Sequence, residues 1–166
     1  RELRISPWWA TLTLVWVCVQ GAFGALTVTM KLFPAIVTLH LLGGMLLLAL
    51  LQVQAQRYAA SGVVPAAAAS RAGASEVAPK GARALLVLTV VALWLQMALG
   101  AWVSTNYAVL ACTEFPACQG SWWPPMNFAQ GFELWRPLGQ TGAGGNIGFE
   151  ALTAIHYVHR LFAYGL

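Results

Sequence analysis

The fold class of this chain is decided by residues 8–30, which read WWATLTLVWVCVQGAFGALTVTM. The run contains 23 residues and no charged side chain. As a helix it would be about 35 Å long, enough to cross the roughly 30 Å hydrocarbon core of a bilayer. Two more uncharged runs lie at 32–52 and 84–105, and a fourth apolar run extends from about 148 to 166. The sequence therefore predicts an all-α membrane protein with four transmembrane helices.

The composition excludes the other common classes of protein. Of the 166 residues, 59% are apolar and 8% are charged, whereas an average soluble domain is roughly a quarter charged. The net charge of +4 comes from nine Lys and Arg residues that form no basic stripe, so we expect no nucleic-acid binding. Aromatic and aliphatic residues dominate, which excludes intrinsic disorder. The eight tryptophans are typical of a membrane–water interface.

Two long connections divide the chain into a first helix pair (1–53), a linker (54–83) and a second helix pair (84–166) with a loop at 106–149. The linker is rich in Ala and in basic residues, whereas the loop carries two Glu and one Arg. By the positive-inside rule we expect the linker in the cytoplasm and the loop on the extracytoplasmic side of a cell inner membrane. Because the chain lacks an initiator Met and stops inside an apolar run, we expect it to be a fragment of a larger protein.

Two of the three cysteines, Cys112 and Cys118, lie six positions apart in the predicted extracytoplasmic loop. An oxidising compartment allows such a pair to form a disulfide. Free thiols or a zinc site are the alternatives, but no nearby histidine completes a zinc ligand set. Cys18, alone in the first predicted helix, is interpreted as a small packing residue.

Aromatic residues in the same loop are predicted to lie at the outer membrane interface, because indole and phenyl groups favour the headgroup level. They are Trp122, Trp123, Phe128 and Trp135. Within this group, residues 127–135 are expected to form a short helix, either as a lid over a pocket or as an anchor on the membrane.

An internal repeat links the first and third apolar runs. Residues 19–29 (VQGAFGALTVT) align without gaps to residues 95–105 (LQMALGAWVST), with five identities in eleven positions. Small residues recur wherever membrane helices pack closely, which is one explanation. The shared glutamine favours two related helical units instead, because a buried amide needs a hydrogen-bond partner. The identical pairs are Gln20/Gln96, Ala22/Ala98, Gly24/Gly100, Ala25/Ala101 and Thr29/Thr105.

All three histidines, His40, His156 and His159, lie in predicted membrane spans, where an ionisable residue is a functional candidate. Counted from the outer ends of their spans, His40 and His159 are about 12 and 13 Å deep. The alternatives are an interhelical hydrogen bond, a proton relay, and ligation of a metal or haem iron. The spans hold no carboxylate suited to proton transport, which favours haem in a helical bundle. Arg160 is expected to balance an anionic group such as a propionate or to bond carbonyl groups.

Several motifs of the chain resemble the haem A synthase family, whose members oxidise haem O for terminal-oxidase assembly. They are LGAWVSTNYA at 99–108, CTEFPAC at 112–118, WWP at 122–124 and IHYVHR at 155–160, together with QGAFGALTV at 20–28 and TLHLLGG at 38–44. The resemblance implies two four-helix bundles in tandem, each with a bis-histidine haem site. This chain would hold the third to sixth transmembrane helices.

The resemblance also implies roles for individual residues. His40 would be an iron ligand of the first-half site and His159 an iron ligand of the second-half site. His156 and Arg160 would be neighbouring groups, with His156 as the alternative ligand. The family's Glu-x-x-His-Arg motif, whose Glu is implicated in the chemistry, would precede Arg1. The catalytic residue is therefore not assigned in this chain, and the fragment alone is expected to be inactive.

The function that the resemblance implies is oxidation of the C8 methyl group of haem O to the formyl group of haem A. Haem b would be the cofactor, and haem O and haem A the substrate and product. A dihaem b-type electron carrier or a haem-handling assembly factor is the alternative, and a histidine-lined transporter is a third. The expected partners are the lipid bilayer, haem O synthase, oxidase assembly factors and a second copy of the chain.

Overall fold

The computed structural model describes residues 6–60 and 79–166, and these residues are helical wherever they form regular structure. The long helices are α1 (Pro7–Thr29), α2 (Pro34–Ala60), α4 (Lys80–Thr105) and α6 (Phe149–Tyr164). Two short elements, η1 (Ala108–Leu110) and α5 (Phe128–Gly131), lie between α4 and α6. The described residues contain no strand, only isolated bridges. The prediction of an all-α protein is confirmed.

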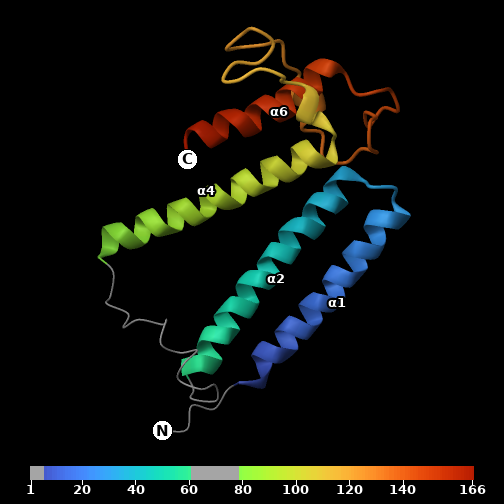
Figure 1. The fold of residues 1–166 in the computed structure, drawn as a ribbon. Coiled ribbons are helices and arrows are strands. Elements are labelled where there is room, and N and C mark those ends of the chain that lie inside the picture. Colours follow the sequence, from blue (N-terminus) through green and yellow to red (C-terminus); the bar gives the residue numbers. More distant parts are fainter. Residues whose placement is uncertain (1–5, 61–78) are drawn as a thin grey trace.

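The long helices form two antiparallel hairpins (Figure 1). In the first, α1 packs along α2, and in the second, α6 returns along α4. The hairpins meet where α2 packs against α4. At that contact the hydroxyl groups of Thr38 and Thr105 lie 3.4 Å apart. The loop between α4 and α6 gathers at the end of α4 that is nearest to the α1–α2 connection (Figure 1).

Three of the described helices are long and apolar enough to cross a membrane: Pro7–Thr29, Pro34–Ala59 and Lys80–Thr105. The fourth predicted span coincides with α6, which has 16 residues and would therefore be about 24 Å long. It also carries Glu150, two histidines and Arg160. Apolar side chains are exposed along α1, α2 and α4, as expected where lipid tails, rather than water, surround a helix.

Helices α2 and α4 extend into the predicted linker at 54–83, because a helix need not end where its apolar run ends. The Gln54 amide in α2 donates to the Trp9 carbonyl oxygen at 2.8 Å and also contacts the Thr13 hydroxyl. One turn later the Arg57 guanidinium lies 4.4 Å from the centre of the Trp9 ring. These contacts with α1 stabilise the added turns of α2. The rest of the predicted linker, 61–78, lies outside the described residues.

The buried core lies at the end of the second hairpin that carries the loop. Trp102 and Val103 of α4 pack with Ala108 and Ile155. The short helix α5 closes over this core: a side chain added at Gly131 would lie 2.8 Å from the Ala151 carbonyl oxygen. This end of the molecule is therefore the best-packed part of the described chain, and it fixes the position of α6.

Candidate functional site

The first hairpin places His40 against a glycine. His40 lies on α2, and a Cβ atom added at Gly24 of α1 would be 3.3 Å from the His40 Cε1 atom. That separation is shorter than an ordinary carbon–carbon contact of about 3.5–4.0 Å. The missing side chain of Gly24 therefore makes the space that the imidazole occupies.

The second hairpin repeats this arrangement with its own residues. His159 lies on α6, and a Cβ atom added at Gly100 of α4 would be 3.0 Å from the His159 Cε1 atom. Gly24 and Gly100 are the equivalent glycines of the internal repeat. The structure thus gives both glycines the same contact, which helix packing by small residues does not by itself require.

A nitrogen of each of these two imidazoles lacks a hydrogen-bond partner. The Nδ1 atoms of His40 and His159 are buried and unpartnered in the described residues. A neutral imidazole has one donor and one acceptor nitrogen, and an unpaired buried polar group costs about 1–3 kcal/mol. Such nitrogens can ligate a metal. The described residues contain no group of three or more His, Cys, Asp or Glu that could hold a metal ion, so an all-protein zinc-type site is not supported.

His156 is oriented toward the loop and away from this arrangement. Its Nδ1 atom accepts a hydrogen bond of 3.3 Å from the Cys112 backbone N–H. Its Nε2 atom lies 3.4 Å from the Arg160 guanidinium. Both ring nitrogens of His156 therefore have neighbours, whereas His159 keeps one nitrogen free.

Arg160 binds backbone carbonyl groups of the loop that contains the cysteines. Its guanidinium donates to the Ala117 oxygen at 2.8 Å, to the Cys112 oxygen at 3.2 Å and also to the Glu114 oxygen. Of the two roles expected from the sequence, the structure contains the carbonyl-bonded one. Arg160 thereby fastens this loop to the helix that carries His159.

The predicted disulfide between Cys112 and Cys118 is confirmed, so the free-thiol and zinc alternatives for this pair are excluded. Further bonds attach its loop to α6: the Tyr157 hydroxyl donates to the Trp122 oxygen, and the Tyr164 hydroxyl donates to the Pro116 oxygen, both at 2.8 Å. We refer to residues 112–122 as the disulfide loop. Cys18, interpreted from the sequence as a small packing residue, is exposed on α1 in the described part of the chain.

A buried arginine was missed in the sequence analysis, where Arg136 counted only as a loop charge. It is fully buried and donates to the Asn106 Oδ1 atom at 2.5 Å and to the Gln140 carbonyl oxygen at 3.2 Å. Burial lowers the pKa of Arg136, and the Glu133 carboxylate raises it in part. No local sequence signal identifies this residue, because one partner, Asn106, lies 30 residues earlier and the other, four residues later, is a backbone carbonyl group.

The loop aromatics that were predicted to lie at the outer membrane interface differ in their exposure. Trp122, Trp123 and Trp135 are 65–69% exposed, and the Trp135 ring lies 4.8 Å from that of Phe33 beside the α1–α2 connection. Phe128, at 43%, is less exposed. The expected helix within 127–135 is limited to the four residues of α5, because Trp102 and α6 anchor Gly131.

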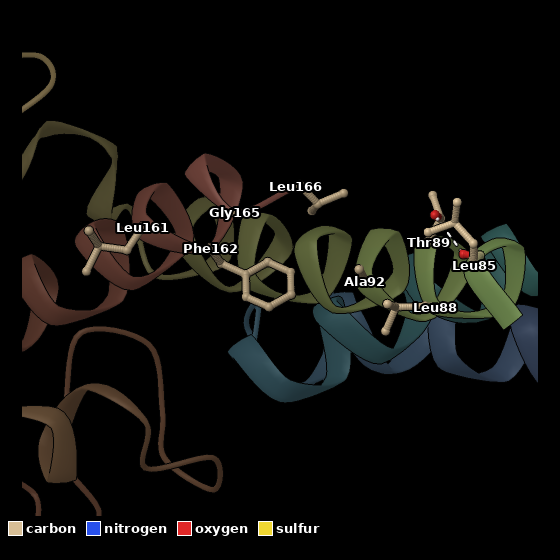
Figure 2. A pocket seen from close by; sticks show the side chains of 8 residues that line it. All are labelled: Leu85, Leu88, Thr89, Ala92, Leu161, Phe162, Gly165 and Leu166. Atoms are coloured by element: carbon tan, nitrogen blue, oxygen red, sulfur yellow. Dashed lines mark hydrogen bonds between the residues drawn. The ribbon is translucent and has the colours of Figure 1, made fainter. Parts of the chain in front are cut away.

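An apolar cavity of about 390 Å³ lies between α4 and the last turns of α6, away from the histidines. Figure 2 shows its only hydroxyl side chain, Thr89, bonded to the Leu85 carbonyl oxygen. The cavity therefore offers space for an apolar group and no chemistry of its own. Its lining residues are Leu85, Leu88, Thr89, Ala92, Leu161, Phe162, Gly165 and Leu166.

Comparison with known proteins gives two matches. A family model described as cytochrome oxidase assembly protein matches residues 1–166. A haem A synthase from Shewanella oneidensis is 38% identical over 144 residues, which cover 87% of this chain and 41% of that protein. The chain thus spans about two fifths of the length of this relative. No solved structure matches the chain.

Proposed function

Because the chain belongs to the cytochrome oxidase assembly protein family, we propose that the protein containing it is a haem A synthase. This enzyme would oxidise the C8 methyl group of haem O to the formyl group of haem A. The 38% identity to a protein of that name supports the assignment of substrate and product. The expected location is the cell inner membrane, with residues 54–83 in the cytoplasm and residues 106–149 outside.

The observation that carries the proposal is the matched pair of histidines. His40 and His159 lie on the second helix of their hairpins, each against the equivalent glycine of the repeat. Each keeps a buried Nδ1 atom without a partner. These residues fit two haem sites, one in each hairpin: His40 would hold the iron of one haem and His159 the iron of the other, because a haem iron takes histidine ligands from the protein. One site would take the substrate haem and the other haem b, which supplies one-electron redox chemistry when it is bound.

The residues around the second site have distinct tasks in this proposal. His159 would hold the iron, since His156 is engaged by the Cys112 N–H and by Arg160. Arg160 holds the disulfide loop against α6 through carbonyl groups. It would therefore keep the loop close to the site. Because its guanidinium already donates to three carbonyl groups, few N–H groups remain for a propionate, the other role expected from the sequence.

Analysis of the haem content tests this function. The protein purified from its membrane should yield haem b together with haem O or haem A when the extracted haem is separated by chromatography. Haem b alone would instead support the dihaem electron carrier or the assembly factor, and a protein without haem absorption would support the transporter.

Two histidine variants test the ligand assignment. His159→Ala should remove or convert one low-spin haem signal, because the iron loses an axial ligand. His156→Ala, a matched control three residues away, should keep that signal. The reverse pattern would make His156 the ligand.

A further inference from the structure

We propose that Gln20 and Gln96 are positioning residues, each the hydrogen-bond partner of the iron-ligating imidazole in its own hairpin. The inference rests on the proposed function, because it requires His40 and His159 to be the ligands. It assigns a common task to the two glutamines of the internal repeat.

The second hairpin shows the contact directly. The Gln96 Nε2 atom lies 3.5 Å from the His159 Nε2 atom and 3.3 Å from the His159 carbonyl oxygen. Gln96 lies one helical turn before Gly100, so the glycine and the amide contact the same imidazole from neighbouring turns of α4. One ring nitrogen of His159 thus faces the amide, and the other is unpartnered. An imidazole that holds an iron would need this division, with one nitrogen for the metal and one for a partner in the protein.

The first hairpin has the same residues in the same order. Gln20 lies one turn before Gly24 on α1, and it is 91% buried, since 9% of its surface is exposed. Its amide nitrogen occupies the space above Gly43, where an added Cβ atom would overlap it. Gly43 is three residues after His40 on α2, so Gln20 lies beside the turn that carries the imidazole.

The unpartnered atoms repeat in the same way. In the described part of the chain, five buried side-chain atoms lack a hydrogen-bond partner. Four of the five are the Oε1 atoms of Gln20 and Gln96 and the Nδ1 atoms of His40 and His159. Each hairpin therefore holds one free amide acceptor and one free imidazole nitrogen. Two buried groups left unpaired in both hairpins are costly for a purely structural arrangement.

The chemistry of an axial histidine accounts for these groups. An imidazole that ligates through one nitrogen carries a proton on the other, and that N–H requires an acceptor. In Gln96 the amide nitrogen faces the ring and donates to the His159 carbonyl oxygen. Rotation of the amide about the last side-chain bond presents Oε1 to the ring N–H instead, in exchange for that donated bond. The hydrogen bond fixes the ring orientation and increases the electron density that the ligand donates. By contrast, the Gln54 amide donates to the Trp9 carbonyl oxygen and to the Thr13 hydroxyl, so its role is to join two helices.

The test is the midpoint potential of each haem, measured by optical redox titration of the purified protein. Gln96→Leu removes the acceptor, and Gln96→Glu replaces it with a stronger one of the same size. We expect the leucine variant to raise the potential of the His159 haem and the glutamate variant to lower it. If a substitution changes the ratio of the site's affinities for ferric and ferrous haem tenfold, the potential shifts by about 59 mV, because the couple transfers one electron. Gln20 variants should shift only the other haem.

Gln54→Leu is the matched control, because it removes a buried glutamine that joins helices without facing an imidazole. It should leave both potentials unchanged. Potentials that do not move, that move in one direction for both substitutions, or that move together in the two haems would overturn the inference. If the leucine variants do not accumulate in the membrane, the shift in the glutamate variants decides alone. A His159→Ala protein with unchanged haem signals would overturn the ligand assignment on which this inference rests. A purified protein without haem O or haem A would instead overturn the proposed function.

Discussion

Replacing Gly100 by alanine should displace the His159 imidazole, and the structure allows the size of the displacement to be estimated. The added Cβ atom would lie 3.0 Å from the His159 Cε1 atom, against an optimum of about 3.5–4.0 Å. The imidazole must therefore move by roughly 0.5–1 Å, and such overpacking costs about 1–3 kcal/mol. Alanine recovers about 1 kcal/mol, because it favours a helix more than glycine does. The expected change is a loss of about 0–2 kcal/mol in the free energy of unfolding, with an altered low-spin spectrum of one haem.

The matched control is Gly21→Ala, since an added Cβ atom at Gly21 meets no atom within 4 Å. This control should keep the full helical gain of about 1 kcal/mol and a wild-type spectrum. The change in the free energy of unfolding for Gly24→Ala should lie between those of Gly100→Ala and Gly21→Ala, because its added Cβ atom would be 3.3 Å from the His40 Cε1 atom. Unfolding by SDS in mixed micelles gives the free energies, and visible absorption gives the haem state. If Gly100→Ala matches Gly21→Ala in both measurements, the imidazole does not depend on the space at this glycine.

Three further predictions concern the loop between α4 and α6. Arg160→Ala should lower the free energy of unfolding in SDS by about 1.5–3 kcal/mol, because it removes charged donors from the disulfide loop; an unchanged value would deny its fastening role. Thiol labelling of the denatured, unreduced protein should modify Cys18 but neither Cys112 nor Cys118, and prior reduction should cost about 2 kcal/mol of stability; labelling of all three without reductant would contradict the disulfide. Arg136→Lys should cost about 1–3 kcal/mol in the same SDS assay, because one of its two acceptors loses its partner, and full stability would show that a point charge suffices there.

The helices could be predicted from the sequence because their signal is local. An uncharged run of 23 residues has few alternatives to a membrane helix, since its backbone must bond internally in lipid. The disulfide followed from the charge asymmetry of the two connections. The end of α2 could not be predicted, because it depends on contacts of Gln54 and Arg57 with Trp9, some 45 residues away.

Within the site, the rare histidines and the internal repeat could be recognised in the sequence, whereas the contacts made by the loop could not. Three histidines stand out in a chain that is 8% charged, and the repeat marked the glycines and glutamines that the structure places beside two of them. The partners of Arg160 could not be read from the sequence, because the carbonyl groups it binds lie 43–48 residues earlier. Carbonyl groups carry no sequence signal, since every residue has one. The burial of Arg136 depends likewise on a partner far away in the sequence, the Asn106 side chain 30 residues earlier.

The attachment of the disulfide loop to α6 has a consequence for how the protein is assembled in the membrane. An arginine at the centre of a lone inserting helix costs about 2.5–3.5 kcal/mol, and α6 combines Arg160 with two histidines in 16 residues. Its guanidinium is satisfied by carbonyl groups that precede it in the chain, so they are synthesised first. A folded disulfide loop would therefore be ready when α6 emerges from the ribosome. The disulfide between Cys112 and Cys118 thus restrains, in advance, the carbonyl groups that receive Arg160 of the helix that carries His159.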